Sequence, residues 1–310
     1  EIVKIIEKSV KDFRLLAERI DKHKSTGDKL IGQSKQIVEL YKMIGKVAMS
    51  RLPVLVFGEK GTGKTSVAKA IHQFSDWSDK PLISLNCTSY QNGLLERKMF
   101  GYEKGAFRGA VFPQIGELEK ANGGTLHLGN IESLSLDMQS KILYFLEEGK
   151  FFRLGGAEPI EVDIRPVALT CVNLEELINQ GKFIDDLYRK LRVLEINIPP
   201  LRDRKDDIPL IIDHYLIECN DELQKNIKGV SKPALKKILR HDWPGNVNEL
   251  KNAIKSAVAL LWFVTIHPFD DGNGRIARTI ADLQLTRSDG SNQRFYSMSS
   301  QIRKNRNSYY

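Results

Sequence analysis

The segment LPVLVFGEKGTGKT (52–65) decides the fold class of this chain. Its apolar first half is typical of a buried strand, and GEKGTGKT (58–65) fits the phosphate-loop pattern G-x-x-x-x-G-K-[ST]. SVAKAIHQF (66–74) then has the apolar spacing of a helix. A glycine-rich turn between a strand and a helix makes this motif convincing, because the helix presents its N-terminus to an anion. The segment therefore predicts a nucleotide-binding site.

The residues of this loop have distinct expected roles. Gly58, Gly61 and Gly63 allow backbone N–H groups to turn inward around phosphate oxygens. We expect Lys64 to reach the β- and γ-phosphates of ATP and Thr65 to bind Mg²⁺. The other residues of the predicted cradle are Glu59, Lys60 and Thr62.

Short apolar runs alternate with helical patterns on both sides of the loop. PLISLNC (81–87), TLHLG (125–129) and RPVALTC (165–171) read as buried strands. This alternation predicts an α/β fold with a parallel sheet covered by helices on both faces. Residues 1–22 predict a leading helix, and the helical pattern after PPLRDRKDD (199–207) predicts a small helical lid domain.

Composition is that of an ordinary globular protein, with 41% hydrophobic and 28% charged residues among 310. The longest apolar run, AVALLWFVTI (257–266), is about half of what a membrane-spanning helix needs. The three cysteines have no paired spacing, so we expect neither disulfides nor zinc, and a cytoplasmic protein. The net charge is +8, and the basic stretch from Arg275 onward fits either phosphate contact or a solvated helix face.

Characteristic segments occur in a fixed order along the chain. They are LIGQS (30–34), the phosphate loop, FGYEKGAFRGA (100–110), ANGGTLHL (121–128), LSLDMQSKILYFLEEGKFFRLGG (134–156), PPLRDRKDDIPL (199–210) and WPGNVNEL (243–250). Together they resemble the central AAA+ domain of bacterial sigma-54-dependent transcriptional activators, the enhancer-binding proteins, over about residues 28–258. The resemblance implies a linker helix (1–27), an α/β nucleotide-binding core (28–198) and a helical lid (199–260).

The same resemblance implies a function and partners. Members of this family form rings, hydrolyse ATP between subunits and remodel sigma-54 RNA polymerase with a GAFTGA loop, so we expect a homo-oligomer or co-assembly with AAA+ homologues. Ile31 is expected to contact ATP or ADP. Phe107 either contacts the partner or packs against the neighbouring helix, and Arg108 replaces the loop threonine, which is expected to weaken the sigma-54 contact. The whole predicted partner loop is Gly105, Ala106, Phe107, Arg108, Gly109 and Ala110.

The positions at which this family carries its catalytic groups have changed. The acid that orients magnesium falls at Gly129, and the acid that polarises the attacking water falls at Asn130. Without carboxylates there, water has no general base. Glu132 is an alternative acid, although a loop position rarely reproduces the geometry of a strand end. The remaining changed positions are the sensor asparagine at Cys171, the two arginine fingers at Ile184 and Lys190, and the lid arginine at Asn248.

The end of the chain resembles a second family. HPFDDGNGRIAR (267–278) matches the Fic motif HPFx[D/E]GNGRxxR at every specified position, and residues 261–310 resemble a partial, all-α Fic (Fido) domain. Fic proteins typically transfer AMP from ATP to a hydroxyl side chain. The resemblance implies that His267 is the base and that Asp271 holds Mg²⁺. The expected phosphate-binding residues are Gly272, Asn273, Gly274, Arg275 and Arg278.

Several interpretations stay open at this point. We favour a nucleotide-binding AAA+ module of transcription regulation whose hydrolysis is impaired, because the loss of six catalytic positions together removes the parts of phosphoryl transfer. The alternatives are a Fic-type AMP transferase, an active AAA+ ATPase, and a gene-fusion remnant. The remnant is motivated by the abrupt change of resemblance near Leu260, with earlier Fic helices not recognisable. No DNA-reading helix and no membrane segment is recognisable either.

Overall fold

The computed structural model describes residues 30–90, 93–223 and 226–266. The chain divides into two compact units between Pro200 and Leu201. We call the part up to Pro200 the core unit and the part from Leu201 the lid unit, and we describe each by itself. The expected leading helix (1–22) and residues 267–310 lie outside the described residues.

A parallel five-stranded sheet forms the centre of the core unit, with the strand order β2-β5-β8-β1-β9. The strands are short, and the three inner ones, β5, β8 and β1, are largely buried, whereas the outer strands β2 and β9 are partly exposed. The chain crosses over between neighbours as in doubly wound folds. Parallel strands end at one edge, so the carboxyl ends of β5, β8 and β1 lie next to one another. The bounds are β1 (Val54–Phe57), β2 (Leu82–Asn86), β5 (Thr125–Gly129), β8 (Arg165–Thr170) and β9 (Leu194–Asn197).

Two apolar clusters flank this sheet. Val54 and Val56 of β1 pack with α2 and α3 in one cluster, whereas Leu55 packs in the other with residues of α4 to α8. Because successive side chains of a strand point to opposite faces, the two clusters lie on the two faces of the sheet. The helices are α2 (Lys35–Ala48), α3 (Lys64–Gln73), α4 (Leu94–Phe100), α5 (Glu117–Lys120), the 3₁₀ turn η1 (Ile131–Ser133), α6 (Leu136–Glu148), α7 (Leu174–Asn179) and α8 (Asp185–Leu191).

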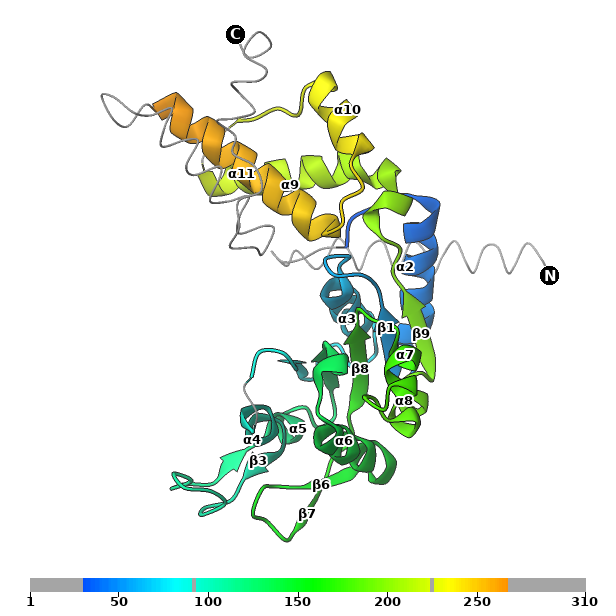
Figure 1. Cartoon of the computed structure of the whole chain (residues 1–310), viewed down its shortest axis with the longest axis vertical. Helices are drawn as coiled ribbons and strands as arrows, with labels where there is room; N and C mark the ends of the chain where they lie inside the picture. Colours follow the sequence, from blue (N-terminus) through cyan, green and yellow to red (C-terminus); the bar gives the residue numbers. More distant parts are fainter. Residues whose placement is uncertain (1–29, 91–92, 224–225, 267–310) are drawn as a thin grey trace, which may run out of the picture. The chain divides into compact units, whose positions relative to one another are not determined.

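Two antiparallel hairpins lie at one end of the core unit (Figure 1). They are joined by backbone hydrogen bonds, since the N–H of Glu103 donates to the carbonyl of Leu154 at 2.9 Å. Arg153 bridges Glu103 and Glu119 at 2.8 and 2.6 Å, which ties the hairpins to α5. A Cβ on Gly101 would lie 2.4 Å from the carbonyl oxygen of Gln114, so this approach requires glycine. The strands are β3 (Gly101–Tyr102), β4 (Gln114–Ile115), β6 (Lys150–Phe152) and β7 (Pro159–Glu161).

The lid unit is helical in its described part. Its two longest helices pack together, and Lys255 of α11 pairs with Glu218 and Glu222 of α9 at 3.0 and 3.2 Å. Asn246, at the start of α11, accepts a hydrogen bond from the N–H of Leu201 at 2.7 Å, which fixes the entry of the unit. The elements are η2 (Leu201–Asp203), η3 (Lys205–Asp207), α9 (Ile208–Leu223), α10 (Lys232–Arg240) and α11 (Asn246–Ile266).

The parallel sheet, the helices on both of its faces and the helical unit after it confirm the predicted fold class. The end of the lid has a feature that the sequence did not indicate. Helix α11 continues through residue 260, where the resemblance changes, and ends at Ile266. Among the residues that the structure describes, no helix is long and apolar enough to cross a membrane.

Candidate nucleotide-binding site

The phosphate loop joins the carboxyl end of β1 to the N-terminus of α3, as the motif predicts. Gly63 has φ +104°, a left-handed conformation that glycine adopts without strain and that starts α3. A Cβ on Gly58 would lie 2.9 Å from Oγ1 of Thr62 and 3.1 Å from Ile198, so the start of the loop is closely packed. The Thr62 hydroxyl donates to the carbonyl of Glu59 at 2.8 Å and holds the loop closed.

Lys64 lies against the loop to which it belongs. Its ammonium donates to the carbonyl oxygens of Gly58 and Glu59 at 2.6 and 2.9 Å. Burial lowers the pKa of Lys64, and the nearby Cys171 and Glu132 act in the opposite direction. Thr65 follows as an exposed residue in the first turn of α3. Both side chains therefore lie at the start of α3, and their contacts with phosphate and Mg²⁺ stay predictions of the motif.

The two positions at the end of β5 where the family pattern has acids are occupied by Gly129 and Asn130. Gly129 is buried as the last residue of the strand. Asn130 follows in a left-handed conformation with φ 55° and ψ 53°. Its amide donates to Oδ1 of Asn86 at 2.9 Å and, more weakly, to Oγ1 of Thr88 at 3.4 Å, so it is bound to the end of β2. Neither residue offers a carboxylate to water or to a metal ion.

Glu132 and Cys171 meet at the same edge of the sheet. The Cys171 thiol donates to Oε1 of Glu132 at 3.0 Å, and the Cys171 N–H approaches the same oxygen at 3.4 Å. Burial raises the pKa of Cys171, and the carboxylate of Glu132 raises it further, so the thiol stays a donor. The second oxygen, Oε2, is buried without a hydrogen-bond partner.

The two predicted arginine-finger positions lie on α8. Ile184 immediately precedes the helix and packs against the apolar core, and its N–H donates to Oε1 of Gln139 at 2.8 Å. It is therefore a packing residue. Lys190 lies in the last turn of α8 and is half-buried. It retains a charge without the planar fork with which arginine spans a phosphoryl group.

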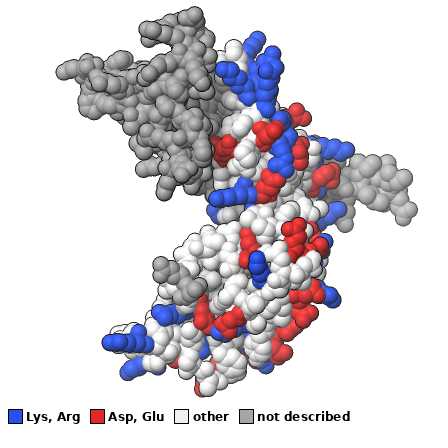
Figure 2. Space-filling view, viewed as in Figure 1, with Lys and Arg blue, Asp and Glu red and all other residues white. Residues whose placement is uncertain are grey.

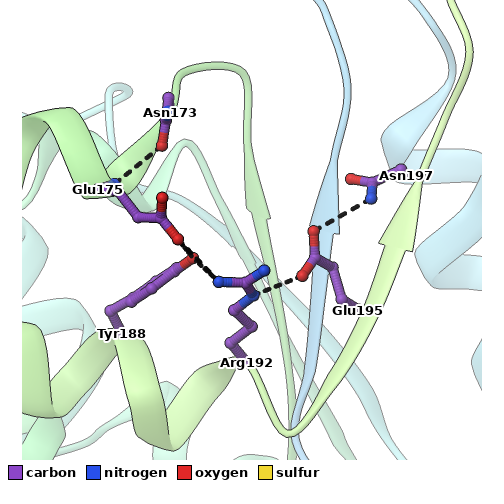
Figure 3. A network of polar contacts seen from close by, with 6 residues as sticks. All are labelled: Asn173, Glu175, Tyr188, Arg192, Glu195 and Asn197. Carbon is purple, nitrogen blue, oxygen red and sulfur yellow. Dashed lines mark hydrogen bonds and ion pairs between the residues drawn. The ribbon is translucent and has the colours of Figure 1, made fainter.

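A polar network that sequence reasoning missed joins α7, α8 and β9 (Figure 3). Arg192, just after α8, donates to Glu175 at 2.8 Å and to Glu195 at 2.5 Å. Tyr188 donates to the same Glu175 oxygen at 2.8 Å and also contacts Arg192. These residues line part of a cavity of about 660 Å³ beside β1, β8 and β9. The partners lie in one short segment of the chain, but charged residues at such spacings are common on exposed surfaces, so the sequence carries only a weak signal for the network.

The predicted partner loop follows β3, and Phe107 lies half-buried within it. Its ring forms an edge contact with Tyr102, with centroids 4.9 Å apart, and the guanidinium of Arg97 lies 3.8 Å from its centroid. The aromatic side chain thus packs against α4, which was the alternative to partner contact. Phe112 instead is 77% exposed and Val111 61%. Figure 2 shows Lys and Arg side chains at the tip of this loop, where Lys104 and Arg108 are exposed.

The other predicted site residues are placed separately. Ile31 is half-buried in the segment before α2. Asn248 is exposed on α11 of the lid unit. The predicted Fic residues lie outside the described residues: His267, Asp271, Gly272, Asn273, Gly274, Arg275 and Arg278.

The loop fits a nucleotide with Mg²⁺ on chemical grounds. Backbone N–H groups at the start of α3 and the ammonium of Lys64 suit phosphate oxygens. The described residues contain no group of three or more His, Cys, Asp or Glu side chains that would hold an ion alone. Mg²⁺ does not require one, because it keeps several waters and uses one or two protein ligands together with phosphates. The partnerless oxygen of Glu132 is one acceptor of this kind.

Comparison with known proteins agrees with this geometry. The family described as Sigma-54 interaction domain matches residues 30–197, and the family described as AAA+ ATPase lid domain matches residues 202–269. The fold and the loop define a P-loop AAA+ module, and the chain belongs to the Sigma-54 interaction domain family. This confirms the resemblance predicted from residues 28–258.

The curated relatives include a nitrogen fixation protein and transcriptional regulatory proteins. The nitrogen fixation protein AnfA of Azotobacter vinelandii is 41% identical over 241 residues, which are 78% of this chain and 45% of that protein. The transcriptional regulatory protein ZraR of Salmonella typhimurium is 43% identical over 232 residues, 75% of this chain and 53% of that protein. The chain spans about half the length of the curated relatives it matches. NtrX from Brucella abortus, solved in complex with ATP, is similar with a TM-score of 0.71 and 29% identity, over 83% of this chain and 58% of that one.

Proposed function

We propose that this chain is a nucleotide-binding AAA+ module of the sigma-54 activator type whose hydrolysis of ATP is impaired. One observation carries the proposal: the phosphate loop (58–65) keeps its strand-loop-helix geometry, while Gly129 and Asn130 occupy the end of β5. The complex of NtrX with ATP supports nucleotide binding by the same fold. Bound ATP or ADP then acts as a structural or switching ligand.

The changed positions argue against efficient phosphoryl transfer. Transfer needs a group that orients the attacking water and cations that neutralise the developing charge. Asn130 binds Asn86, and Ile184 is an apolar residue that packs against the core, so neither supplies such a group. Loss of an arginine finger alone costs roughly 10³ to 10⁵ in rate. The combined changes at these catalytic positions support a site that binds ATP but hydrolyses it slowly.

The proposed biological role is transcription regulation in association with other subunits. The names of the curated relatives support it, among them transcriptional regulatory protein ZraR. We propose that the chain assembles with itself or with AAA+ homologues. Its loop 105–112 is the proposed contact with sigma-54 RNA polymerase, with Arg108 in place of the threonine and Phe112 as an exposed apolar group.

A Fic-type AMP transferase is the second candidate function. The match of HPFDDGNGRIAR (267–278) to the complete motif favours it. In that case His267 removes the proton of the target hydroxyl, whose oxygen attacks the α-phosphate of ATP, so that AMP is attached to the protein and pyrophosphate is released.

One experiment separates these functions. The purified chain is incubated with Mg²⁺ and α-labelled ATP, and filter binding, released ADP and protein-attached label are measured. We expect ATP to be retained on the filter unchanged and retention to be lost in Lys64→Ala. Release of ADP that depends on Lys64 would instead show that the chain is an active ATPase. Protein label that disappears in His267→Ala would make the chain a Fic enzyme.

A further inference from the structure

Two side chains that follow β5 lie toward opposite neighbours of that strand. Asn130 binds Asn86 at the end of β2, whereas Glu132 binds Cys171 just after β8. The sheet order is β2-β5-β8-β1-β9. Asn130 is therefore directed away from the phosphate loop that follows β1, and Glu132 is directed toward it.

The backbone explains how a residue beyond the strand reaches this place. The left-handed conformation of Asn130 turns the chain into the 3₁₀ turn η1. Asparagine enters this conformation more readily than most residues. Ile131 is fully buried in the core and anchors the turn. Glu132 is thus held at the edge of the sheet by its two neighbours and by Cys171, not carried on a free loop.

The carboxylate of Glu132 is only half satisfied. Oε1 accepts from Cys171, but Oε2 is buried and has no hydrogen-bond partner. A buried polar group without a partner is destabilising, and more so when it is charged. Glu132 is bonded to Cys171 just after β8, and β8 is the neighbour of β1, which the phosphate loop follows. The free oxygen therefore belongs to the phosphate-binding site, and a hydrated cation there would satisfy it.

We propose that Glu132 is the acid that faces Mg²⁺ in this site, in place of the strand-end carboxylates that Gly129 and Asn130 lack. This inference rests on the proposed nucleotide binding. Together with the hydroxyl of Thr65, one carboxylate is sufficient for an ion that otherwise binds phosphate oxygens and water. It supports binding of the metal–nucleotide complex without replacing the second acid that orients the attacking water.

The test is the magnesium dependence of ATP affinity in the full chain. ATP binding is titrated with Mg²⁺ and with EDTA for the wild type and Glu132→Gln. In the wild type, we expect Mg²⁺ to tighten binding by about tenfold or more, the range found for groups that support a bound metal. In Glu132→Gln we expect this gain to fall to about twofold. Affinity in EDTA is expected to stay the same or to rise, because a negative charge near the phosphates is removed.

Two further variants make the result specific. Asp137→Asn removes an exposed acid that pairs with Lys141 on α6, and it should keep the full magnesium gain. Cys171→Ser keeps a hydrogen-bond donor to Glu132 and should therefore keep most of the gain in ATP affinity on adding Mg²⁺.

The possible outcomes decide between two roles of Glu132. An equal loss of affinity with and without Mg²⁺ in Glu132→Gln would assign it to holding Cys171 and overturn the inference. An unchanged magnesium gain beside normal ATP binding would overturn it as well, while leaving the proposed function intact. Absence of ATP binding by the wild type would overturn the proposed function and this inference with it.

Discussion

His127 is a buried titratable residue in the middle of β5, one strand away from β1 in the sheet. Its Nδ1 lies 3.1 Å from the hydroxyl oxygen of Ser84, whereas Nε2 has no hydrogen-bond partner. Burial, with a smaller contribution from Lys69, lowers the pKa of His127 to about 4. The folded state therefore holds the neutral ring at a pH at which the unfolded chain takes up a proton.

Stability should fall as the solution becomes more acidic. Between an unfolded pKa near 6.5 and a folded pKa of about 4, protons bind preferentially to the unfolded chain, so stability is lost as pH falls through this range. At pH 5 the loss from His127 amounts to about 2 kcal/mol relative to pH 8. Urea unfolding of the wild type and of His127→Gln, at both pH values, measures it.

The two variants should differ in how strongly their free energy of unfolding depends on pH. His127→Gln should lose most of this dependence, and His241→Gln, which changes an exposed histidine of the lid unit, should keep it. An equal pH dependence of the free energy of unfolding in the wild type and in His127→Gln would contradict the assignment of this loss of stability to His127.

Gly129, Asn130 and Glu132 illustrate what can be predicted for single residues of the site. Sequence comparison with the family's pattern identified the first two as lacking acids. It also suggested that Glu132, as a loop residue, would not lie at the strand end. In the structure Glu132 contacts Cys171 at that edge, because the turn at Asn130 reverses the chain. Such a turn depends on backbone dihedrals that residue types only bias.

The loop after β3 separates two aromatic residues that the sequence does not distinguish. Phe107 contacts Tyr102 and Arg97 and thus holds the loop against α4. Phe112 is 77% exposed, and Val111 and Ile115 beside it are also exposed. Exposed aromatic groups are enriched at protein interfaces. The element thus has an anchoring residue and a residue available to a partner.

Matched variants of this loop test the division. Phe107→Ala should lower the free energy of unfolding by about 1–2 kcal/mol through its lost ring and guanidinium contacts. Phe112→Ser should change it by less than about 0.5 kcal/mol, because surface substitutions rarely do more. Binding to sigma-54 RNA polymerase, measured by gel shift with purified holoenzyme, should weaken in Phe112→Ser. If Phe112→Ser binds the polymerase unchanged and Phe107→Ala does not bind it, Phe107 rather than Phe112 is the contact residue.

Helix α8 shows how packing decides a role that alignment alone suggests. Ile184 and Lys190 occupy the finger positions, but Ile184 is partly buried and packs against the apolar core. Two arginines lie near them: Arg189 of α8 pairs with Asp185 at 2.6 Å. Arg192, just after the helix, is held by Glu175 and Glu195 within its own unit. The guanidinium of Arg192 therefore forms ion pairs that connect α7 to β9.

The changed catalytic positions come from separate elements: β5, β8 and α8 in the core unit and α11 in the lid unit. Restoring one of them should therefore not restore hydrolysis. Gly129 has ordinary space for a side chain, since an added Cβ would meet nothing closer than 3.6 Å. Glu at position 130 would cost roughly 1–2 kcal/mol in its left-handed conformation.

We expect Gly129→Asp/Asn130→Glu to fold and to release ADP within about threefold of the wild-type rate, because the fingers remain absent. Adding Ile184→Arg and Lys190→Arg supplies these cations, and ADP release should then rise. An increase of about a hundredfold or more in the double variant would show that the strand-end acids alone had limited the reaction.

The sequence by itself determined the α/β fold, the phosphate loop and the absence of strand-end acids. These features depend on local patterns: the apolar runs of β1 and β5, the glycines of the loop and the residue types at 129 and 130. Tertiary structure alone decided the directions of Asn130 and Glu132, the packing of Phe107 and Ile184, and the commitment of Arg192. The contacts of Phe107 and Arg192 join nearby segments, but they depend on how a loop and short helices pack in three dimensions. The contacts of Asn130, Glu132 and Ile184 join segments distant in sequence, and they exist only once the fold has placed those strands and helices side by side.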